Sequence, residues 1–472
     1  MTTPPPSTQV KRHLKTRHLS MIAIGGCIGT GLFMASGTAI HSAGPGGALV
    51  AYAAIGLMVY FLMTSLGEMA TWLPTSGSFA TYASRYVDPS LGFALGWNYW
   101  FNWVITVAVD ISIAAVVITY WEPLRALMPA WGWSLTFFGI ICALNAFSVR
   151  AYGESEYWFA LIKVITVIIF LCIGTLTIFG IMGGEYVGFS NFTAGDGPFL
   201  GNGAGGHFLT ILGVFLIAGF SFQGTELIGV TAGETENPEK SIPKAVKQIF
   251  WRILIFYMGA VTIMLLALPW NDPALKEAPF VAVLNAAGLP AIAALIGIVI
   301  VVALLSSLNA NLYGGSRMIS SLAERRMGPA MMRGTNARGV PVAAVLSTSF
   351  LGFIAAALNY FWAEEVLKFL LNMVGSTMIV IWLGIIVSHL ALRRRAVRDG
   401  NPASTGFPVA LSWATLVAVV AVVALGFTVP EIAMQLSSTF ALTALLAAVG
   451  GWLATRAGGT GPGSEPAANN RM

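Results

Sequence analysis

Charged residues are scarce in this chain of 472 residues. They make up 10% of the sequence, whereas hydrophobic residues make up 56% and the mean hydropathy is +0.77. An ordinary soluble domain carries about 25% charged residues, and a soluble chain of this length could not hide so much apolar surface. The composition therefore excludes an ordinary soluble protein and indicates a membrane protein, because lipid itself can cover apolar side chains.

Cysteine and histidine are also sparse. The three cysteines, Cys27, Cys142 and Cys172, lie in apolar stretches without paired spacing, so we expect neither a disulfide framework nor a metal site. The five histidines are scattered and lie mostly near the ends of apolar stretches, which disfavours an enzyme embedded in the membrane. We therefore predict no enzymatic activity, no metal and no cofactor.

Long apolar runs occupy most of the chain. Many are roughly 20 residues long with few or no charges, which is enough for a helix to cross ~30 Å of hydrocarbon. We predict an all-α integral membrane protein with twelve transmembrane helices. Their approximate bounds are residues 19–41, 46–72, 92–120, 132–149, 156–182, 208–232, 246–269, 285–320, 341–360, 366–391, 408–428 and 433–455.

The positions of the basic residues predict the orientation. With a cytoplasmic N-terminus, 21 of the 25 lysines and arginines fall in inside segments and only Arg125, Lys276 and Lys368 fall outside. This asymmetry follows the positive-inside rule and explains the net charge of +5 without a nucleic-acid partner. We therefore expect cytoplasmic tails at 1–18 and 456–472 around a membrane domain at 19–455, in the cell inner membrane.

The first predicted span contains a glycine-rich interruption, Gly25-Gly26-Cys27-Ile28-Gly29-Thr30-Gly31. Glycine costs about 1 kcal/mol relative to alanine inside a helix, so a continuous helix is unfavourable here. Free backbone groups at membrane depth are tolerated only where they line a cavity or are buried in protein. Amides at the start of a half-helix attract an anion such as a substrate carboxylate. Close helix packing through small residues is the alternative interpretation.

The sixth predicted span is interrupted by Phe220-Ser221-Phe222-Gln223-Gly224-Thr225-Glu226. Spans 1 and 6 correspond to each other if the chain consists of two five-span repeats followed by two further spans. Paired interruptions in the two halves of a membrane protein point to the binding site of a transporter. The coincidence therefore predicts a transporter with its substrate at the two breaks.

Four charged residues are predicted to lie at membrane depth: Glu68, Asp110, Lys163 and Glu226. Each is costly in hydrocarbon and is a functional candidate for that reason. Glu68 lies near the inner end of its span, where a local structural role is favoured. Asp110 suits either a structural pair or a substrate contact. Lys163 suits either proton exchange, because burial disfavours its charged form, or a fixed pair with a buried carboxylate.

The aromatic string Trp97-Asn98-Tyr99-Trp100-Phe101-Asn102-Trp103 begins the membrane part of the third span. A belt at the membrane interface accounts for most of it. Helical steps of four and seven place Tyr99, Trp103 and Asp110 roughly on one side. We expect this side to line a pocket.

These motifs resemble those of the amino acid–polyamine–organocation transporters, and within them the bacterial amino acid transporter family, the lysine permeases most of all. The resemblance covers nearly the whole chain. Besides the two breaks, it rests on residues 15–26, 77–82, 93–100, 156–159, 234–238 and 242–245.

The resemblance implies a LeuT-like fold of five-plus-five inverted repeats with helices 1 and 6 broken. The repeats would cover about 19–182 and 208–391, with two extra helices at about 408–455. Main-chain amides of the first break would hold the substrate carboxylate, main-chain oxygens would hold its α-ammonium, and the ring of Phe220 would be a gate. The backbone-binding residues implied are Cys27, Ile28, Gly29, Thr30, Gly31, Phe220 and Gln223.

For the substrate side chain, Asp110 and Glu226 would hold the ε-ammonium of lysine in a pocket with Tyr99 and Trp103. Lys163 matches a fifth-span lysine that, in proton-coupled relatives, takes the place of a bound sodium ion. The implied activity is secondary active import of a cationic amino acid, L-lysine above all, coupled to protons by alternating access.

Other interpretations stay open. Another amino acid, aromatic or GABA-like, or exchange in place of uptake, would use the same two breaks. A nutrient sensor is an interpretation from a different class, and a membrane-embedded enzyme or channel is disfavoured. The expected partners are a small amino acid, protons and the lipid bilayer; the sequence does not predict the oligomeric state.

Overall fold

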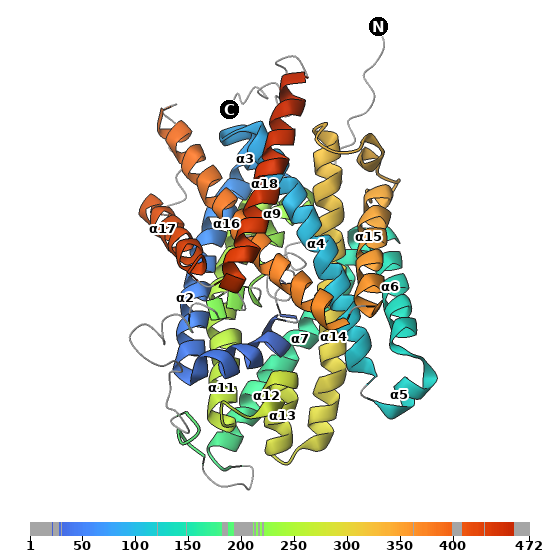
Figure 1. The fold of residues 1–472 in the computed structure, drawn as a ribbon, viewed down its shortest axis with the longest axis vertical. Coiled ribbons are helices and arrows are strands. Elements are labelled where there is room, and N and C mark those ends of the chain that lie inside the picture. The colour runs from blue at the N-terminus through green and yellow to red at the C-terminus, as the bar shows by residue number, and fades with distance from the viewer. Residues whose placement is uncertain are drawn as a thin grey trace.

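The computed structural model describes residues 21, 28–29, 31–119, 121–147, 149–181, 187–192, 211, 214–215, 218–219, 221–361, 363–398, 408–428 and 430–456. Every element assigned within these residues is helical (Figure 1). Eight of the described helices are long and apolar enough to cross a membrane. The chain is therefore an all-helical, multi-pass membrane protein.

The helices follow the predicted spans closely along most of the chain. In order they are η1 (Gly31–Ala35), α2 (Ser36–Trp72), α3 (Ser78–Tyr86), α4 (Pro89–Ile118), α5 (Glu122–Leu127), α6 (Ala130–Phe147), α7 (Val149–Ile178), α9 (Leu227–Thr231), η2 (Ala232–Glu234), α10 (Pro238–Arg252), η3 (Ile253–Met258), α11 (Gly259–Ala267), α12 (Pro273–Glu277), α13 (Pro279–Ala286), α14 (Pro290–Glu324), η4 (Ala330–Arg333), α15 (Val342–Phe361), α16 (Ala363–Arg398), α17 (Val409–Gly426) and α18 (Pro430–Arg456).

A kink inside α2 separates the first predicted span from the second. Gly44 has φ 71° and ψ 175°, a conformation that glycine adopts without the steric cost of a side chain. Pro45 follows and has no backbone N–H to continue the hydrogen-bond ladder. The helix before the kink thus completes the first span, and the helix after it is the second.

The predicted start of the eighth span, at residue 285, is wrong. Residues 279–286 instead form α13, and Gly288, with φ 73°, turns the chain before α14 begins at Pro290. Proline suits this first helical position because its missing N–H would have no partner there. The apolar pattern alone could not separate α13 from α14, because both helices are apolar.

Short helices lie at both ends of the bundle. Helix α3 lies at one end, and α5, α12 and α13 lie at the other (Figure 1). The end that carries α3 is basic: Arg325, at the end of α14, donates to the main-chain oxygen of Ala80 at 3.2 Å, and Arg395 of α16 donates to that of Arg85 at 3.0 Å. We call it the basic end.

The last two helices are attached to the rest by buried hydrogen bonds. In α17, the hydroxyl of Ser412 is 3.1 Å from that of Ser65 in α2 and 3.1 Å from Nδ1 of His389 in α16. In α18, Thr443 accepts from Asn98 of α4 at 2.7 Å. Helix α4 also packs against α14, α15 and α16, so it lies at the centre of the bundle.

Candidate functional site

The first break is described at Ile28, Gly29 and from Gly31 onward. Ile28 and Gly29 form a bend, and helix begins at Gly31 as a π-helical turn. The amide of Phe33 donates to the main-chain oxygen of Gly29 at 3.0 Å, which closes this first turn. The predicted site residues Cys27 and Thr30 lie outside the described residues.

The second break is a run of turns from Phe222 to Glu226. Gly224 has φ 93°, which L side chains rarely adopt. Bonds between residues three apart replace the helical ladder, such as the amide of Leu227 to the oxygen of Gly224 at 3.2 Å. Helix α9 then begins at Leu227, as the predicted interruption of the sixth span requires. Phe220, the predicted gate, lies outside the described residues.

The two breaks touch each other. The hydroxyl of Ser221 donates to the main-chain oxygen of Gly31 at 3.0 Å. A Cβ added at Gly31 would lie 2.3 Å from the Cα of Ser221, so the backbones meet where no side chain fits. Tyr52 bonds to the hydroxyl of Ser221 at 2.9 Å, and Tyr257 donates to its main-chain oxygen at 2.7 Å. The two breaks, which correspond by their positions in the sequence, are therefore in contact.

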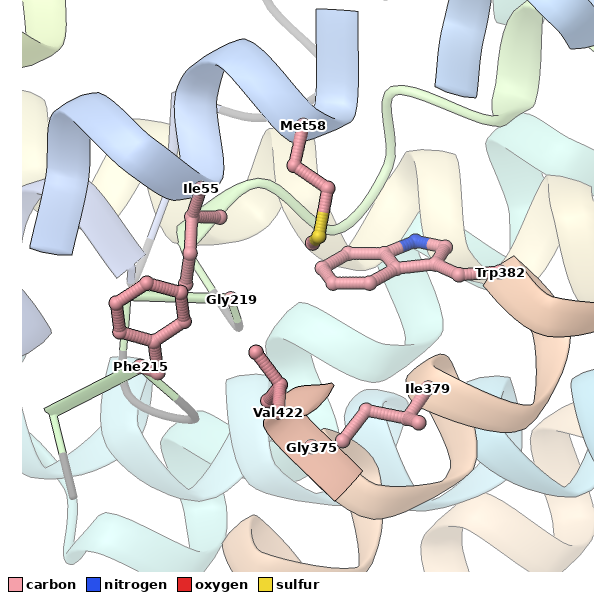
Figure 2. Close-up of a pocket in the computed structure, with 8 residues that line it drawn as sticks. All are labelled: Ile55, Met58, Phe215, Gly219, Gly375, Ile379, Trp382 and Val422. Atoms are coloured by element: carbon pink, nitrogen blue, oxygen red, sulfur yellow. The ribbon is translucent and has the colours of Figure 1, made fainter. Parts of the chain in front are cut away.

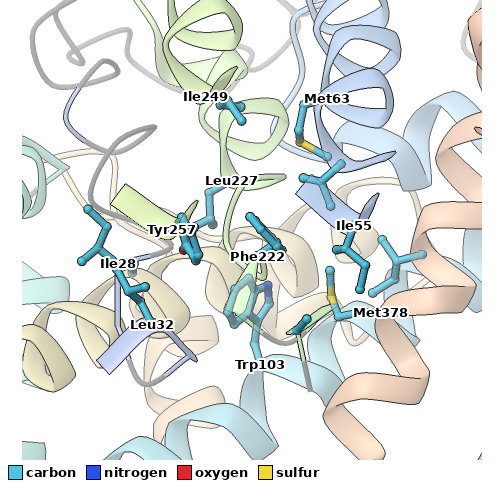
Figure 3. Close-up of a cluster of buried hydrophobic side chains, with 14 of the residues drawn as sticks. Ile28, Leu32, Ile55, Met63, Trp103, Phe222, Leu227, Ile249, Tyr257 and Met378 are labelled. Carbon is cyan, nitrogen blue, oxygen red and sulfur yellow. The ribbon is translucent and has the colours of Figure 1, made fainter. Parts of the chain in front are cut away.

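Apolar side chains surround this junction. Ile28, Leu32, Trp103, Phe222 and Tyr257 lie around the breaks (Figure 3). The rings of Phe222 and Tyr257 stack with their centroids 4.6 Å apart. These side chains exclude water, and electrostatic interactions are stronger in such surroundings.

Glu226 lies at the end of the second break and is fully buried. Its carboxylate accepts from the amide of Gly224 at 3.1 and 3.2 Å and from the hydroxyl of Tyr99 at 3.3 Å. The ring of Trp103 packs edge-on against that of Tyr99, with centroids 5.1 Å apart. Three of the four residues predicted for the side-chain pocket are therefore neighbours.

Asp110, the fourth, belongs to a separate polar cluster against α14. Its Oδ2 accepts from Asn311 at 2.7 Å, and the same amide nitrogen is 3.3 Å from the hydroxyl of Ser307. A Cβ added at Gly29 would lie 3.4 Å from Ser307. Asp110 is thus connected to the first break through Asn311 and Ser307, whereas Glu226 belongs to the second.

Lys163 is fully buried, with its Nζ 3.9 Å from Oε1 of Glu156. Glu156 also accepts from Ser306 at 2.8 Å and from Asn309 at 3.2 Å, both on α14. Glu156, the first residue of the predicted span 156–182, is not among the predicted site residues. The sequence did contain a signal, because Glu156 and Lys163 are seven residues apart and would lie on one face of a helix. The helix α7 begins before both residues, at Val149.

Glu68 has the local structural surroundings that its place in the sequence suggested. Its Oε2 is 2.7 Å from Nη2 of Arg393 and 3.2 Å from Nε2 of His389. Both partners lie on α16, so the ion pair joins α2 to α16.

A third ion pair of buried residues lies near the basic end and was missed. Arg317 of α14 donates to Glu234 at 3.1 Å, and Tyr313 donates to the same carboxylate at 2.5 Å. The ring of Tyr152 stacks on that of Tyr313, with centroids 3.8 Å apart. Glu234 stands in the string at 234–238 that carried the family resemblance, but charge alone did not distinguish it from its exposed neighbours.

A small apolar cavity lies beside the second break (Figure 2). Its volume is about 20 Å³, room for about one water-sized probe and too little for an amino acid. Trp382 and Ile379 of α16 face Phe215 and Gly219 across it. Its lining residues are Ile55, Met58, Phe215, Gly219, Gly375, Ile379, Trp382 and Val422.

Comparison with known sequences gives a match over almost the whole chain. Residues 18–454 match the family model described as amino acid permease. The lysine-specific permease LysP of Escherichia coli (strain K12) is 49% identical over 401 residues, which cover 83% of this chain and 80% of that protein. The histidine permease HisP of Lactococcus lactis subsp. cremoris (strain MG1363) is 46% identical over 401 residues, 83% of this chain and 82% of that protein.

Comparison with solved structures gives a likeness of fold. A manganese transporter of Eremococcus coleocola superposes with a TM-score of 0.54 and 12% identity, covering 96% of each chain. At this identity the likeness shows a shared fold alone. It agrees with the LeuT-like fold that the family resemblance implies.

Proposed function

Because the chain belongs to the amino acid permease family, we propose that it is a secondary active transporter that imports a cationic amino acid, L-lysine above all, with protons. The observation that carries this proposal is the pair of buried carboxylates at the breaks. Glu226 ends the second break, and Asp110 is connected to the first through Asn311 and Ser307. Carboxylates buried in a membrane span are functional candidates, and their negative charge suits a cationic substrate.

The substrate backbone would bind where the two breaks touch. Amides around Gly29 and Gly31, with Ile28 and Thr30, would hold the carboxylate. Main-chain oxygens of Cys27, Phe220 and Gln223 would hold the α-ammonium. The contact of Gly31 with Ser221 supports this assignment, because it brings main-chain groups of both breaks to one place. The ring of Phe220 would close over the substrate.

The side chain of lysine would extend toward Asp110 and Glu226, with Tyr99 and Trp103 as pocket walls. A carboxylate has room for about four hydrogen bonds. The ammonium would therefore join the donors that these carboxylates already have, without displacing them.

Lys163 would couple transport to protons, and Glu156 would position it. Oε1 of Glu156 lies 3.9 Å from Nζ of Lys163, within ion-pair distance, so it can hold the ammonium in place. Transfer of a proton to or from Lys163 would change the charge that α7 presents to α14.

We propose twelve transmembrane helices with both termini in the cytoplasm, in the cell inner membrane. The basic end supports this orientation, because cytoplasmic segments carry an excess of lysine and arginine.

Uptake into proteoliposomes tests the proposal. Purified protein should accumulate radiolabelled lysine when the interior is alkaline, and unlabelled arginine and ornithine should compete. Strong competition by an aromatic or neutral amino acid, with none by arginine or ornithine, would contradict a cationic substrate.

Histidine is the second candidate substrate, because the histidine permease is nearly as similar as the lysine permease. GABA-like and aromatic substrates, and exchange in place of net uptake, belong in the same competition panel. A channel would show conductance well above the turnover of a transporter.

A further inference from the structure

Within the described residues, the side-chain amide of Gln223 forms hydrogen bonds through its nitrogen and none through its oxygen. Gln223 lies in the second break and is 7% exposed. Its Nε2 donates to Oδ1 of Asn102 at 2.6 Å and to the hydroxyl of Thr106 at 3.2 Å. Its Oε1 is buried and accepts no hydrogen bond from the part of the chain that the structure describes.

The surrounding bonds fix the direction of this amide. Asn102 donates through Nδ2 to the main-chain oxygen of Val374 at 3.0 Å, so its Oδ1 acts only as an acceptor. Thr106 donates its hydroxyl proton to the main-chain oxygen of Asn102 at 2.8 Å, so its oxygen also needs a donor. Only the NH₂ end of Gln223 satisfies both neighbours. Its carbonyl oxygen is therefore forced to the side without a partner.

The side-chain amide of Gln223 lies where the second break contacts α4. Thr106 precedes Asp110 by one turn of α4, a rise of about 6 Å. Gln223 also precedes Glu226 by three residues in the same break. The amide therefore joins the two elements that carry the proposed carboxylates: the second break, which carries Glu226, and α4, which carries Asp110.

A buried acceptor without a donor is unfavourable, and a native structure seldom keeps one without a reason. The ammonium of lysine carries three N–H donors, and one carboxylate does not satisfy all of them. We propose that Oε1 of Gln223 accepts a hydrogen bond from the side-chain ammonium of the substrate, which makes Gln223 a residue that determines specificity. This inference rests on the proposed import of a cationic amino acid.

Such an acceptor favours binding of the cationic substrate over a neutral one. A neutral amino acid of the same length would leave Oε1 unpaired in the complex, and sites built around a hydrogen bond discriminate strongly against analogues that lack it. Norleucine, which has the carbon chain of lysine without the ε-amino group, is therefore the informative competitor.

The experiment measures the concentration of unlabelled lysine, or of norleucine, that halves the uptake of labelled lysine into proteoliposomes. These two concentrations are the lysine value and the norleucine value. The ratio of the norleucine value to the lysine value gives the selectivity. In Gln223→Met, which has nearly the same length without the carbonyl, this ratio should fall at least ten-fold, mainly through a higher lysine value.

Thr106→Val is the matched control, because it removes one partner of Nε2 and leaves Oε1 in place. If Gln223 has a purely structural role, Gln223→Met and Thr106→Val should raise the lysine value and the norleucine value by the same factor, so that their ratio does not change. That result would overturn the inference. An unchanged ratio in Gln223→Met would overturn it too, while lysine uptake by the wild type leaves the proposed function standing. If the wild type takes up no lysine, the proposed function itself fails and the inference fails with it.

Discussion

Ser221 donates its hydroxyl to the main-chain oxygen of Gly31 at 3.0 Å, and this hydrogen bond joins the two helix breaks directly. Because that proton is used, the hydroxyl of Tyr52, 2.9 Å away, donates to Ser221 in turn. Ser221 thus accepts a hydrogen bond from α2 and donates one to the first residue of η1. The local geometry of both breaks depends on this contact.

Gly31→Ala should abolish uptake while the protein still inserts into the membrane. The new Cβ would lie 2.3 Å from a backbone atom of Ser221, so the breaks would have to separate. Overpacking of this kind costs about 1–3 kcal/mol. Lysine uptake and the amount of protein in the membrane are the measurements. Gly139→Ala is the control, because a Cβ there meets nothing within 4 Å, and this variant should transport normally. Equal uptake by the two variants would show that transport does not depend on the close contact of Gly31 with Ser221.

Lys163→Met should lose accumulation driven by a pH gradient and retain exchange of external for internal lysine. The variant keeps a long side chain but cannot take up a proton. Uptake with and without the gradient, together with counterflow, separates the two activities. Full accumulation by Lys163→Met would show that another group carries the proton.

Glu156→Gln should destabilise the protein more than the double variant Glu156→Gln with Lys163→Met. Removing one partner of a buried ion pair costs about 3–5 kcal/mol, because the other charge is left without compensation. Restoring neutrality should recover part of that loss. Thermal unfolding in detergent, followed by the loss of monodisperse protein, is the measurement; a double variant less stable than Glu156→Gln would contradict the pairing.

Glu226→Gln should raise the KM for lysine at least ten-fold, which corresponds to about 1.4 kcal/mol. The change removes the charge and keeps the shape of the side chain. Tyr99→Phe removes only the hydroxyl that donates to Glu226 at 3.3 Å, and a typical hydrogen bond contributes about 1 kcal/mol, so its effect should be smaller. An unchanged KM in Glu226→Gln would remove this carboxylate from the binding site.

Arg317→Met should lower the free energy of unfolding by about 3–5 kcal/mol, because Glu234 would stay buried without its cation. The exposed pair of Arg125 and Glu122, at 2.8 Å with side chains 62% and 81% exposed, provides the control. Arg125→Met should change stability by less than about 1 kcal/mol. Similar effects at both sites, measured by thermal unfolding, would contradict a special role for the buried pair.

The sequence predicted the helical class and the second break because both have strong local causes. Apolar runs of sufficient length require helix in a membrane, and Gly224 permits the positive φ of the turn. The first break is described only in part, but the bend at Ile28 and Gly29 lies inside the predicted interruption.

Partners across the bundle could not be predicted from one sequence. Asp110 and Glu226 looked equivalent as buried carboxylates, yet they belong to different clusters, because only tertiary packing brings Asn311 to one and Tyr99 to the other. Similarly, the α14 residues that bond to Glu156 are some 150 positions further along the chain. Helical periodicity gives the face of a residue but not the neighbour that meets it.

The hydrogen bonds of Ser412 have a mechanical consequence. They tie α17 to α2 and α16 at one point, and the ion pair of Glu68 with Arg393 joins the same two helices directly. These contacts act as a clamp that holds α2 and α16 at a fixed spacing. Any movement that separates α2, α16 and α17 at this point would therefore have to break these contacts.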